Sequence, residues 1–405
     1  MGHAHQNSLL GLILLNLVAT CASDCTTDFR DENLNAENGG FKSTNLKVCD
    51  VPTFLNVNCT LEENLKSHLQ TVINRTFEDL WDRCSLDRLR LFLTKPPANV
   101  SITILTNSML RLDQGINILI CDIFLQKIGF KFIEDGAFDS LERLEFVHLQ
   151  GNYLQTIKNE TFRKLVYLRK LDLSKNVIFK LHEGWSDNLQ RLRILNLSYN
   201  HLSHLSLSHF KSLKNLRELD ISGNHLWRID VSTFKDLKNL IILDLSGNSL
   251  DSFYFGTFDN LRTLTTLNIS NNKFEMLPLY TFHATDNLEN LNFSNNRISD
   301  LDLNALERLQ FKRVDFRGNQ LSCDFLLDLI EHLEKKHIHF IKENITEDDN
   351  VYGFGCINSY QTTEDDDYVT YLTRQMSRLS RRVETLSKKL DEVLHLQEKQ
   401  NTGHN

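Results

Sequence analysis

Asparagine recurs every 24 residues through the middle of this chain, and the residues around it repeat with it. The first clear copy spans 147–154, where two aliphatic residues bracket one polar residue and the asparagine stands three positions later. The last copy spans 314–321. The repeated asparagines are Asn152, Asn176, Asn200, Asn224, Asn248, Asn272 and Asn296, followed by Asn319 after 23 residues. A fixed period of this length indicates a protein built from stacked structural units.

The repeated frame resembles the LxLxxNxL pattern of leucine-rich repeats, which implies an α/β repeat solenoid with a parallel sheet on its concave side. The two aliphatic residues are expected to point inward from a short strand. The asparagine side chain is expected to bond backbone groups that would otherwise be buried without partners. A second column, ten positions after the asparagine position, predicts a stack of large side chains on the convex side: Phe138, Phe162, Phe210, Phe234, Phe258 and Phe282. Trp185 and Leu306 are expected to take this place in the two repeats that break the column.

Upstream of this region the pattern weakens. Residues 102–109 are predicted to form a further repeat with Asn107 at the ladder position. Residues 123–130 fit if Ile128 replaces the asparagine, which would interrupt the ladder there. Residues 60–83 have two interpretations, the tail of a degenerate repeat or an amphipathic helix. The sequence does not separate them.

The N-terminus predicts secretion. Residues 9–18 form an apolar core of signal-peptide length, too short to span a bilayer, and cleavage is expected near Ser23. The alternative is a buried N-terminal helix. No later segment is long and apolar enough to cross a membrane, so we expect a secreted protein without a membrane span.

Glycosylation sequons agree with an extracellular protein. The formal charge of −8 arises from 53 acidic and 45 basic residues, with no contiguous basic block of the kind that nucleic acid or heparin would need. The sequons are at Asn58, Asn74, Asn99, Asn159, Asn196, Asn268, Asn292 and Asn344.

Two cysteines follow the last repeat. Cys323 stands directly after it, residues 324–335 have the apolar spacing of a helix, and Cys356 comes 33 residues after Cys323. A Cys323–Cys356 disulfide would close a helical cap over the open end of the solenoid. Closing a loop of that size is expected to stabilise the fold by about 3–4 kcal/mol.

The N-terminal cysteines are odd in number if Cys21 leaves with the signal peptide. Two pairs would leave one thiol over, which points to an interchain disulfide or a free thiol. Cys25 and Cys121 are the candidates, and an unpaired cysteine buried in the N-terminal cap is the alternative. The five are Cys25, Cys49, Cys59, Cys84 and Cys121.

The C-terminal segment after Asp367 is predicted to be a coiled-coil helix. An isolated helix with one apolar stripe is marginal in water, so it is expected to need a partner helix, from another copy or another protein. A helix that folds back onto the solenoid is the alternative. The apolar seam consists of Val369, Leu372, Met376, Leu379, Val383, Leu386, Leu390 and Val393.

Catalytic, metal and cofactor signatures are not found, so we expect a binding protein and not an enzyme. Two groups of histidines, at 201–209 and 332–339, lack ligand spacing with cysteine or carboxylates. One strand position alternates between aspartate and asparagine, as a solvated repeat face would. Three of its asparagines, Asn196, Asn268 and Asn292, are sequons. We therefore hypothesise that binding is displaced to the N-terminal part of the concave face, the caps and the tail.

These features divide the chain into five segments. They are the signal peptide 1–23, an N-terminal cap with degenerate repeats 24–100, the leucine-rich repeats 101–321, a C-terminal cap 322–362 and the coiled-coil tail 363–405.

This order of segments resembles the mosquito leucine-rich-repeat immune proteins, and the short coil is most similar to the shorter members. The resemblance implies a haemolymph protein that oligomerises through disulfides and coiled coils and binds extracellular proteins, including a complement-like factor. Unlike the longer members, this chain has only Cys323 and Cys356 after the repeats. Two other classes stay open: a secreted adhesion or guidance protein, and a soluble decoy related to Toll-like receptor ectodomains.

Overall fold

The computed structural model describes residues 25–31, 53–60, 88–94, 103–110, 120–277, 279–301, 306, 309–341, 350–351 and 354–357. The chain divides into two units, Met1–Ile357 and Asn358–Asn405. Outside the described residues lie the predicted signal peptide, the segment 61–83 and the predicted coiled coil with its seam.

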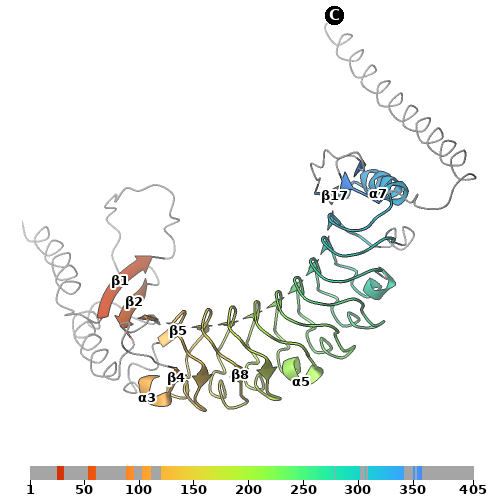
Figure 1. Cartoon of the computed structure of the whole chain (residues 1–405). Coiled ribbons are helices and arrows are strands. Elements are labelled where there is room, and N and C mark those ends of the chain that lie inside the picture. The colour runs from red at the N-terminus through yellow and green to blue at the C-terminus, as the bar shows by residue number, and fades with distance from the viewer. Residues whose placement is uncertain are drawn as a thin grey trace, which may run out of the picture. The chain divides into compact units, whose positions relative to one another are not determined.

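A thirteen-stranded sheet runs through the described part of the first unit, in the order β1-β2-β3-β5-β7-β9-β11-β12-β13-β14-β15-β16-β17. Its strands line the inner side of the stacked repeats (Figure 1). Each repeat strand has three residues, of which the central one is the inward aliphatic anchor. The repeat strands are β7 Phe146–His148, β9 Lys170–Asp172, β11 Ile194–Asn196, β12 Glu218–Asp220, β13 Ile242–Asp244, β14 Thr266–Asn268, β15 Asn290–Asn292 and β16 Arg313–Asp315.

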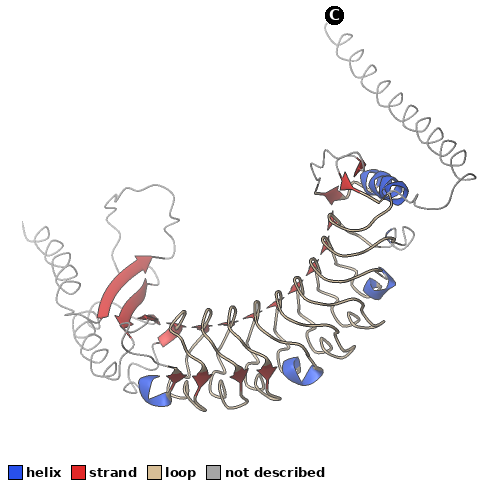
Figure 2. Cartoon of the chain, viewed as in Figure 1, coloured by secondary structure: helices blue, strands red, loops and turns tan. Residues whose placement is uncertain are grey.

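Adjacent repeat strands are parallel and in strict register. Leu195 of β11 pairs with Leu171 of β9 on one side and with Leu219 of β12 on the other. The opposite side of the stack carries only short elements, which are mostly turns (Figure 2). These are β4 Ile104–Leu105 with β6 Phe132–Ile133, β8 Thr156–Ile157 with β10 Lys180–Leu181, α3 Asn107–Leu110, α5 Leu207–Phe210 and the 3-10 turn η1 Leu279–Phe282.

The N-terminal strands extend the sheet beyond the clear repeats. Strand β1 Cys25–Asp31 is antiparallel to β2 Thr53–Thr60, whereas β2, β3 Arg88–Thr94 and β5 Ile120–Phe124 are parallel. The described sheet therefore begins with a strand of reversed direction.

One predicted repeat is wrong. The strand that pairs with β5 is β3, so residues 102–109 do not contribute a strand to the main sheet. Instead β4 pairs with β6, and Asn107 begins α3, where its Nδ2 donates to the carbonyl of Gly136. The spacing misled because an apolar pair with a later asparagine also suits an outer strand followed by a helical turn.

The predicted asparagine ladder is present. Asn200 Oδ1 accepts from the backbone N–H of Ile178 at 2.9 Å, and its Nδ2 donates to the carbonyls of Leu173 and Leu197, each at 3.0 Å. The ladder starts at Asn152, whose Oδ1 accepts from the N–H of Ile128. In the preceding repeat Ile128 stands at the position of the ladder asparagine, and it is 2 % exposed. Equivalent contacts are made by Asn152, Asn176, Asn224, Asn248, Asn272, Asn296 and Asn319.

The predicted column of large side chains fills the opposite side of the core. Neighbouring rings lie within stacking or edge contact, with centroids 6.5 Å apart for Phe234 and Phe258 and 5.4 Å for Phe258 and Phe282. Where Trp185 replaces phenylalanine, it packs edge-on against Phe162 at 6.4 Å. All members of the column are buried, so each repeat shares its largest apolar side chain with its neighbours.

Position 223 needs a glycine because the ring of Tyr199 in the preceding repeat lies against it. It has φ +62°, and a Cβ there would lie 2.8 Å from Cδ1 of the Tyr199 ring. We expect Gly223→Ala to lower the free energy of unfolding by about 1–2 kcal/mol, measured by urea denaturation. Tyr199→Ala/Gly223→Ala should recover the steric part of the loss. Equal losses in both variants would show that the ring plays no part.

The C-terminal cap is a helix followed by a final strand. Helix α7 Cys323–Lys335 begins at Ser322, whose side chain accepts from the N–H of Phe325, and it buries Leu326, Leu329, Ile330 and Leu333. Strand β17 His339–Phe340 then joins the edge of β16. Strands β18 Asn350–Val351 and β19 Phe354–Gly355 form a small antiparallel pair. The cap therefore covers both the edge and the open core.

The cap is tied to the last repeat by covalent and apolar contacts. A disulfide joins Cys323 and Cys356 across a separation of 33 residues. The Phe316 ring stacks on Phe354 with centroids 5.0 Å apart. The backbone of Ile357 exchanges hydrogen bonds with Leu321 and Cys323. The return segment is thus held against the end of the solenoid.

Candidate binding surfaces

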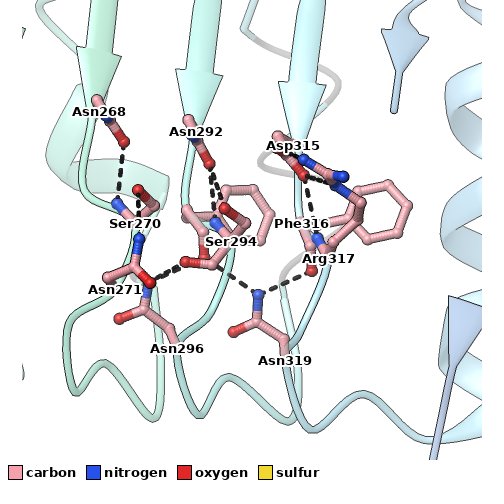
Figure 3. Close-up of polar contacts among 11 residues, drawn as sticks. Asn268, Ser270, Asn271, Asn292, Ser294, Asn296, Asp315, Phe316, Arg317 and Asn319 are labelled. Atoms are coloured by element: carbon pink, nitrogen blue, oxygen red, sulfur yellow. Dashed lines mark hydrogen bonds and ion pairs between the residues drawn. The ribbon is translucent and has the colours of Figure 1, made fainter. Parts of the chain in front are cut away.

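The aspartate and asparagine position of the concave face has a structural role. Asp220 Oδ1 accepts from both the N–H and the hydroxyl of Ser222, at 2.9 and 2.6 Å. Asn292 Oδ1 makes the same two contacts with Ser294, at 3.0 and 2.8 Å (Figure 3). These side chains fix the chain where it leaves each strand. Each of these carboxylates is therefore tied to the strand end of its own repeat.

Three sequons belong to this position. Asn196, Asn268 and Asn292 are all half-buried in the concave sheet. Asn268 Nδ2 donates to Asp244 Oδ2 at 2.9 Å. For Asn196 and Asn292 the strand-end bonds use Oδ1, which leaves the nitrogen, the atom that a glycan modifies, outside these bonds. Glycans at these positions remain a prediction.

The N-terminal end of the concave face breaks the repetitive pattern. His148 in β7 lies with Nε2 3.2 Å from Asp122 Oδ1 in β5, and its ring stacks on Phe124 at 4.2 Å with an interplanar angle of 3°. Asp122 is 4 % exposed, and Phe124, Phe146 and His148 are half-buried. We call these four residues the N-terminal concave patch. It replaces short polar side chains with aromatic rings and an acid–imidazole contact.

The sequence analysis missed the members of this patch. The sequence did contain a signal for the patch. The repeats from β9 to β15 carry aspartate or asparagine followed two positions later by serine, whereas the β7 repeat carries His148 and Gln150 at these two positions. Only the strand register shows that His148 stands beside Phe124. A break in a repeated surface position is therefore the feature to look for in such chains.

An open cavity of about 630 Å³ lies on the outer side of the repeats between 159 and 209. Its lining includes Asn159, Phe179, His182, His204 and His209. His209 is the most enclosed of the histidines that line it, and its Nδ1 accepts from the N–H of Ser206 at 3.1 Å. That bond requires the unprotonated Nδ1 of a neutral ring.

Burial lowers the pKa of His209, and the nearby His204 acts in the same direction, against a smaller opposing effect of the Leu181 carbonyl and Glu183. The unfolded chain therefore takes up a proton below pH about 6.5 that the folded protein resists. We expect the stability contribution of neutral His209 to be complete above that pH and to be lost as the pH falls toward the lower folded pKa.

This expectation is testable with urea unfolding between pH 7.5 and 5. The free energy of unfolding should fall on acidification, and His209→Gln should make the fall shallower, since an amide cannot titrate. The same substitution at the exposed His283 is the control. An unchanged slope in His209→Gln would contradict the assignment.

The cysteines proposed for interchain bonding differ in their settings. Cys121 lies in β5 and is 5 % exposed, so its sulfur is not presented at the surface. Cys25 lies in β1, directly opposite Cys59 of β2 in the strand register. The pairing of the N-terminal cysteines stays a prediction.

Among the residues that the structure describes, no three histidine, cysteine or acidic side chains come together to hold a metal ion. No helix within the described ranges has the length and hydropathy to span a bilayer.

Comparison with known proteins supports the repeat fold. The profile of the family described as "Leucine rich repeat" matches residues 123–178, 166–226, 215–274 and 262–321. Podocan of Mus musculus is 36 % identical over 90 residues, which cover 22 % of this chain and 15 % of podocan. The chain thus spans only a small part of that relative.

Two solved structures align with this chain. In the crystal structure of a TLR13–ssRNA13 complex, the TLR13 chain aligns with a TM-score of 0.54 at 23 % identity, covering 62 % of this chain and 34 % of that one. A repeat protein from Leptospira interrogans aligns with a TM-score of 0.46 at 23 % identity, covering 63 % of this chain and 76 % of that one. The first alignment shows a common fold.

Proposed function

Because this chain is a leucine-rich-repeat protein, we propose that it is a secreted scaffold that binds other extracellular proteins in innate immunity. In this proposal it recognises a pathogen surface protein or a complement-like factor. Its solenoid presents the recognition surface. The predicted coiled-coil tail assembles it with a second copy or a different chain.

The N-terminal concave patch is the observation that carries the proposal. Most of the concave face repeats short polar side chains that bond within their own strand ends, as Asp220 does with Ser222. The patch instead offers half-buried rings beside an acid–imidazole contact, with Phe124 stacked on His148. Aromatic residues in a partly enclosed setting dominate protein–protein binding energies.

Extracellular residence is supported by chemistry that suits an oxidising compartment. The Cys323–Cys356 disulfide closes the cap, and such bonds persist outside the cytosol. The distant similarity to podocan and the predicted signal peptide and sequons agree with this assignment.

The experiment is affinity capture from body fluid with the secreted, tagged protein, in parallel with and without reductant. Phe124→Ala/His148→Ala should reduce recovery of the bound protein about tenfold, since two such contacts are worth roughly 1.5 kcal/mol or more. The matched control is Thr266→Ala/Asn290→Ala, on the repetitive part of the same face. Equal recovery by both double variants would exclude the patch.

The tissue in which the transcript is expressed distinguishes an immune role from an adhesion role. Induction of the transcript in blood cells or fat body after infection is expected. Restriction to neurons or muscle would favour an adhesion or guidance role instead. Recovery only as a free monomer would exclude assembly through the tail.

A further inference from the structure

Three arginines stand side by side where the chain enters successive strands. Arg169, Arg193 and Arg217 each come directly before a strand, β9, β11 and β12 respectively. Their backbones form a ladder, in which the N–H of Arg193 donates to the carbonyl of Arg169 and the N–H of Arg217 donates to the carbonyl of Arg193, both at 2.8 Å. This ladder holds the three side chains in one column at the spacing of adjacent strands.

A second column contains a tyrosine between two arginines. The guanidinium carbon of Arg191 lies 4.7 Å from the centre of the Tyr167 ring, and that of Arg143 lies 5.6 Å from it. These contacts orient both planar groups before any ligand binds. Because two guanidinium groups already contact the tyrosine ring, the ring is less available to stack on a ligand.

The two columns form a local positive surface on a negative protein. We define the arginine strip as Arg143, Arg169, Arg191, Arg193 and Arg217. The chain as a whole carries a formal charge of −8. The strip residues are spread over the sequence from 143 to 217, so no basic run marks them. The repeat register brings them together.

The strip is only partly neutralised within the protein. Arg169 forms an ion pair with Glu145 at 3.3 Å. Arg193 and Arg217 are exposed and form no ion pair with any residue in the described ranges. Like charges on directly adjacent strands destabilise a sheet. Positions that keep this repulsion are candidates for recognition of an opposite charge.

The neighbouring row of the sheet is partly apolar. Phe146 and Ile194 are half-buried, and Ile242 is 39 % exposed. These residues alternate along the row with Lys170 and Glu218. Lys170, Ile194 and Glu218 directly follow the strip residues Arg169, Arg193 and Arg217. Arginine and aromatic side chains beside aliphatic ones form the composition of protein-binding surfaces.

We propose that the arginine strip binds an acidic segment of a protein partner, whose carboxylates pair with the guanidinium groups while its apolar side chains contact Phe146, Ile194 and Ile242. This inference rests on the proposed function and specifies the chemistry of its partner. A polysaccharide or nucleic acid fits less well, because two guanidinium groups already contact the Tyr167 ring, on which a sugar or base would have to stack.

The test uses the full-length secreted protein and three fluorescent probes. Two are 15-residue peptides with two isoleucines, one rich in glutamate and the other with glutamine at those positions. The third is heparin. The wild type should bind the glutamate peptide with salt-dependent affinity and should bind the glutamine peptide at least tenfold more weakly.

The variant Arg193→Glu/Arg217→Glu reverses two exposed charges that hold no structural partner among the described residues. It should weaken binding of the glutamate peptide by about tenfold or more, through lost pairs and added repulsion. Lys235→Glu/Lys273→Glu makes the same change in net charge at exposed positions elsewhere on the repeats and should stay within about twofold of wild type.

Three results would overturn the inference. They are equal weakening in both variants, binding of the glutamine peptide as tight as the glutamate one, or tighter binding of heparin with the same dependence on Arg193 and Arg217. Capture from body fluid distinguishes the two proposals. If Arg193→Glu/Arg217→Glu still recovers a protein that Phe124→Ala/His148→Ala loses, the proposal that the arginine strip binds the partner is contradicted. The proposed scaffold function is then unaffected.

Discussion

Replacing Asn224 with alanine is expected to lower the free energy of unfolding by about 3–5 kcal/mol. Its Oδ1 accepts from the N–H of Leu202 at 3.0 Å. Its Nδ2 donates to the carbonyls of Leu197 and Ile221, each at 3.0 Å, and to that of Ser222 at 3.2 Å. Asn224 is 4 % exposed, so water cannot readily replace these bonds. Each buried polar group left without a partner costs about 1–3 kcal/mol.

The measurement is urea unfolding followed by far-ultraviolet circular dichroism, with the slope of the transition fitted for each variant. Asn215→Ala is the control, because Asn215 is exposed although its Nδ2 also donates to a backbone carbonyl, that of Gln190, at 2.8 Å. It should change stability by less than about 0.5 kcal/mol. A loss below about 1 kcal/mol for Asn224→Ala would mean that the ladder contributes little.

Removing the cap disulfide is expected to have an effect of similar size. Cys323→Ser/Cys356→Ser should lower the free energy of unfolding by about 3–4 kcal/mol, because the bond closes a loop of 33 residues in the unfolded chain. Reduction of the wild type should give the same loss. Both results come from thermal and urea unfolding with and without reductant.

In Cys323→Ser/Cys356→Ser the C-terminal end of the solenoid should also open locally. Backbone amides of β17 and of helix α7 are expected to exchange hydrogen faster than those of β12, because each repeat is stabilised by its neighbours. Uniform acceleration along the whole sheet would contradict a local role. An unfolding free energy unchanged within about 0.5 kcal/mol would show that apolar packing of Phe316 and Phe354 holds the cap without the bond.

The sequence alone predicts the repeated parts of the fold well, because the same physical requirement is met many times. The asparagine ladder and the apolar column each follow from one position per repeat, and helix α7 follows from the spacing of Leu326, Leu329, Ile330 and Leu333. The prediction fails at 102–109, where the upstream sequence does not repeat clearly enough to set the phase and an outer strand has the same apolar spacing.

The surfaces were harder to predict than the scaffold. Asp122 and His148 are 26 residues apart in sequence, and Arg169, Arg193 and Arg217 are separated by whole repeats. Only the strand register shows that these residues are neighbours in the folded protein. The concave sequons were identified as positions, but the bonds of Asn196 and Asn292 to the following serine depend on the turn geometry.

Those strand-end bonds have an evolutionary consequence. An aspartate followed two residues later by serine and an asparagine followed two residues later by serine make the same contact, as Asp220 and Asn196 show. The second arrangement is also an acceptor for N-linked sugar. A point mutation at Asp172, Asp220 or Asp244 to asparagine would therefore add an acceptor without disturbing the turn. A solenoid of this kind can gain or lose carbohydrate on its inner surface, repeat by repeat, while its architecture stays unchanged.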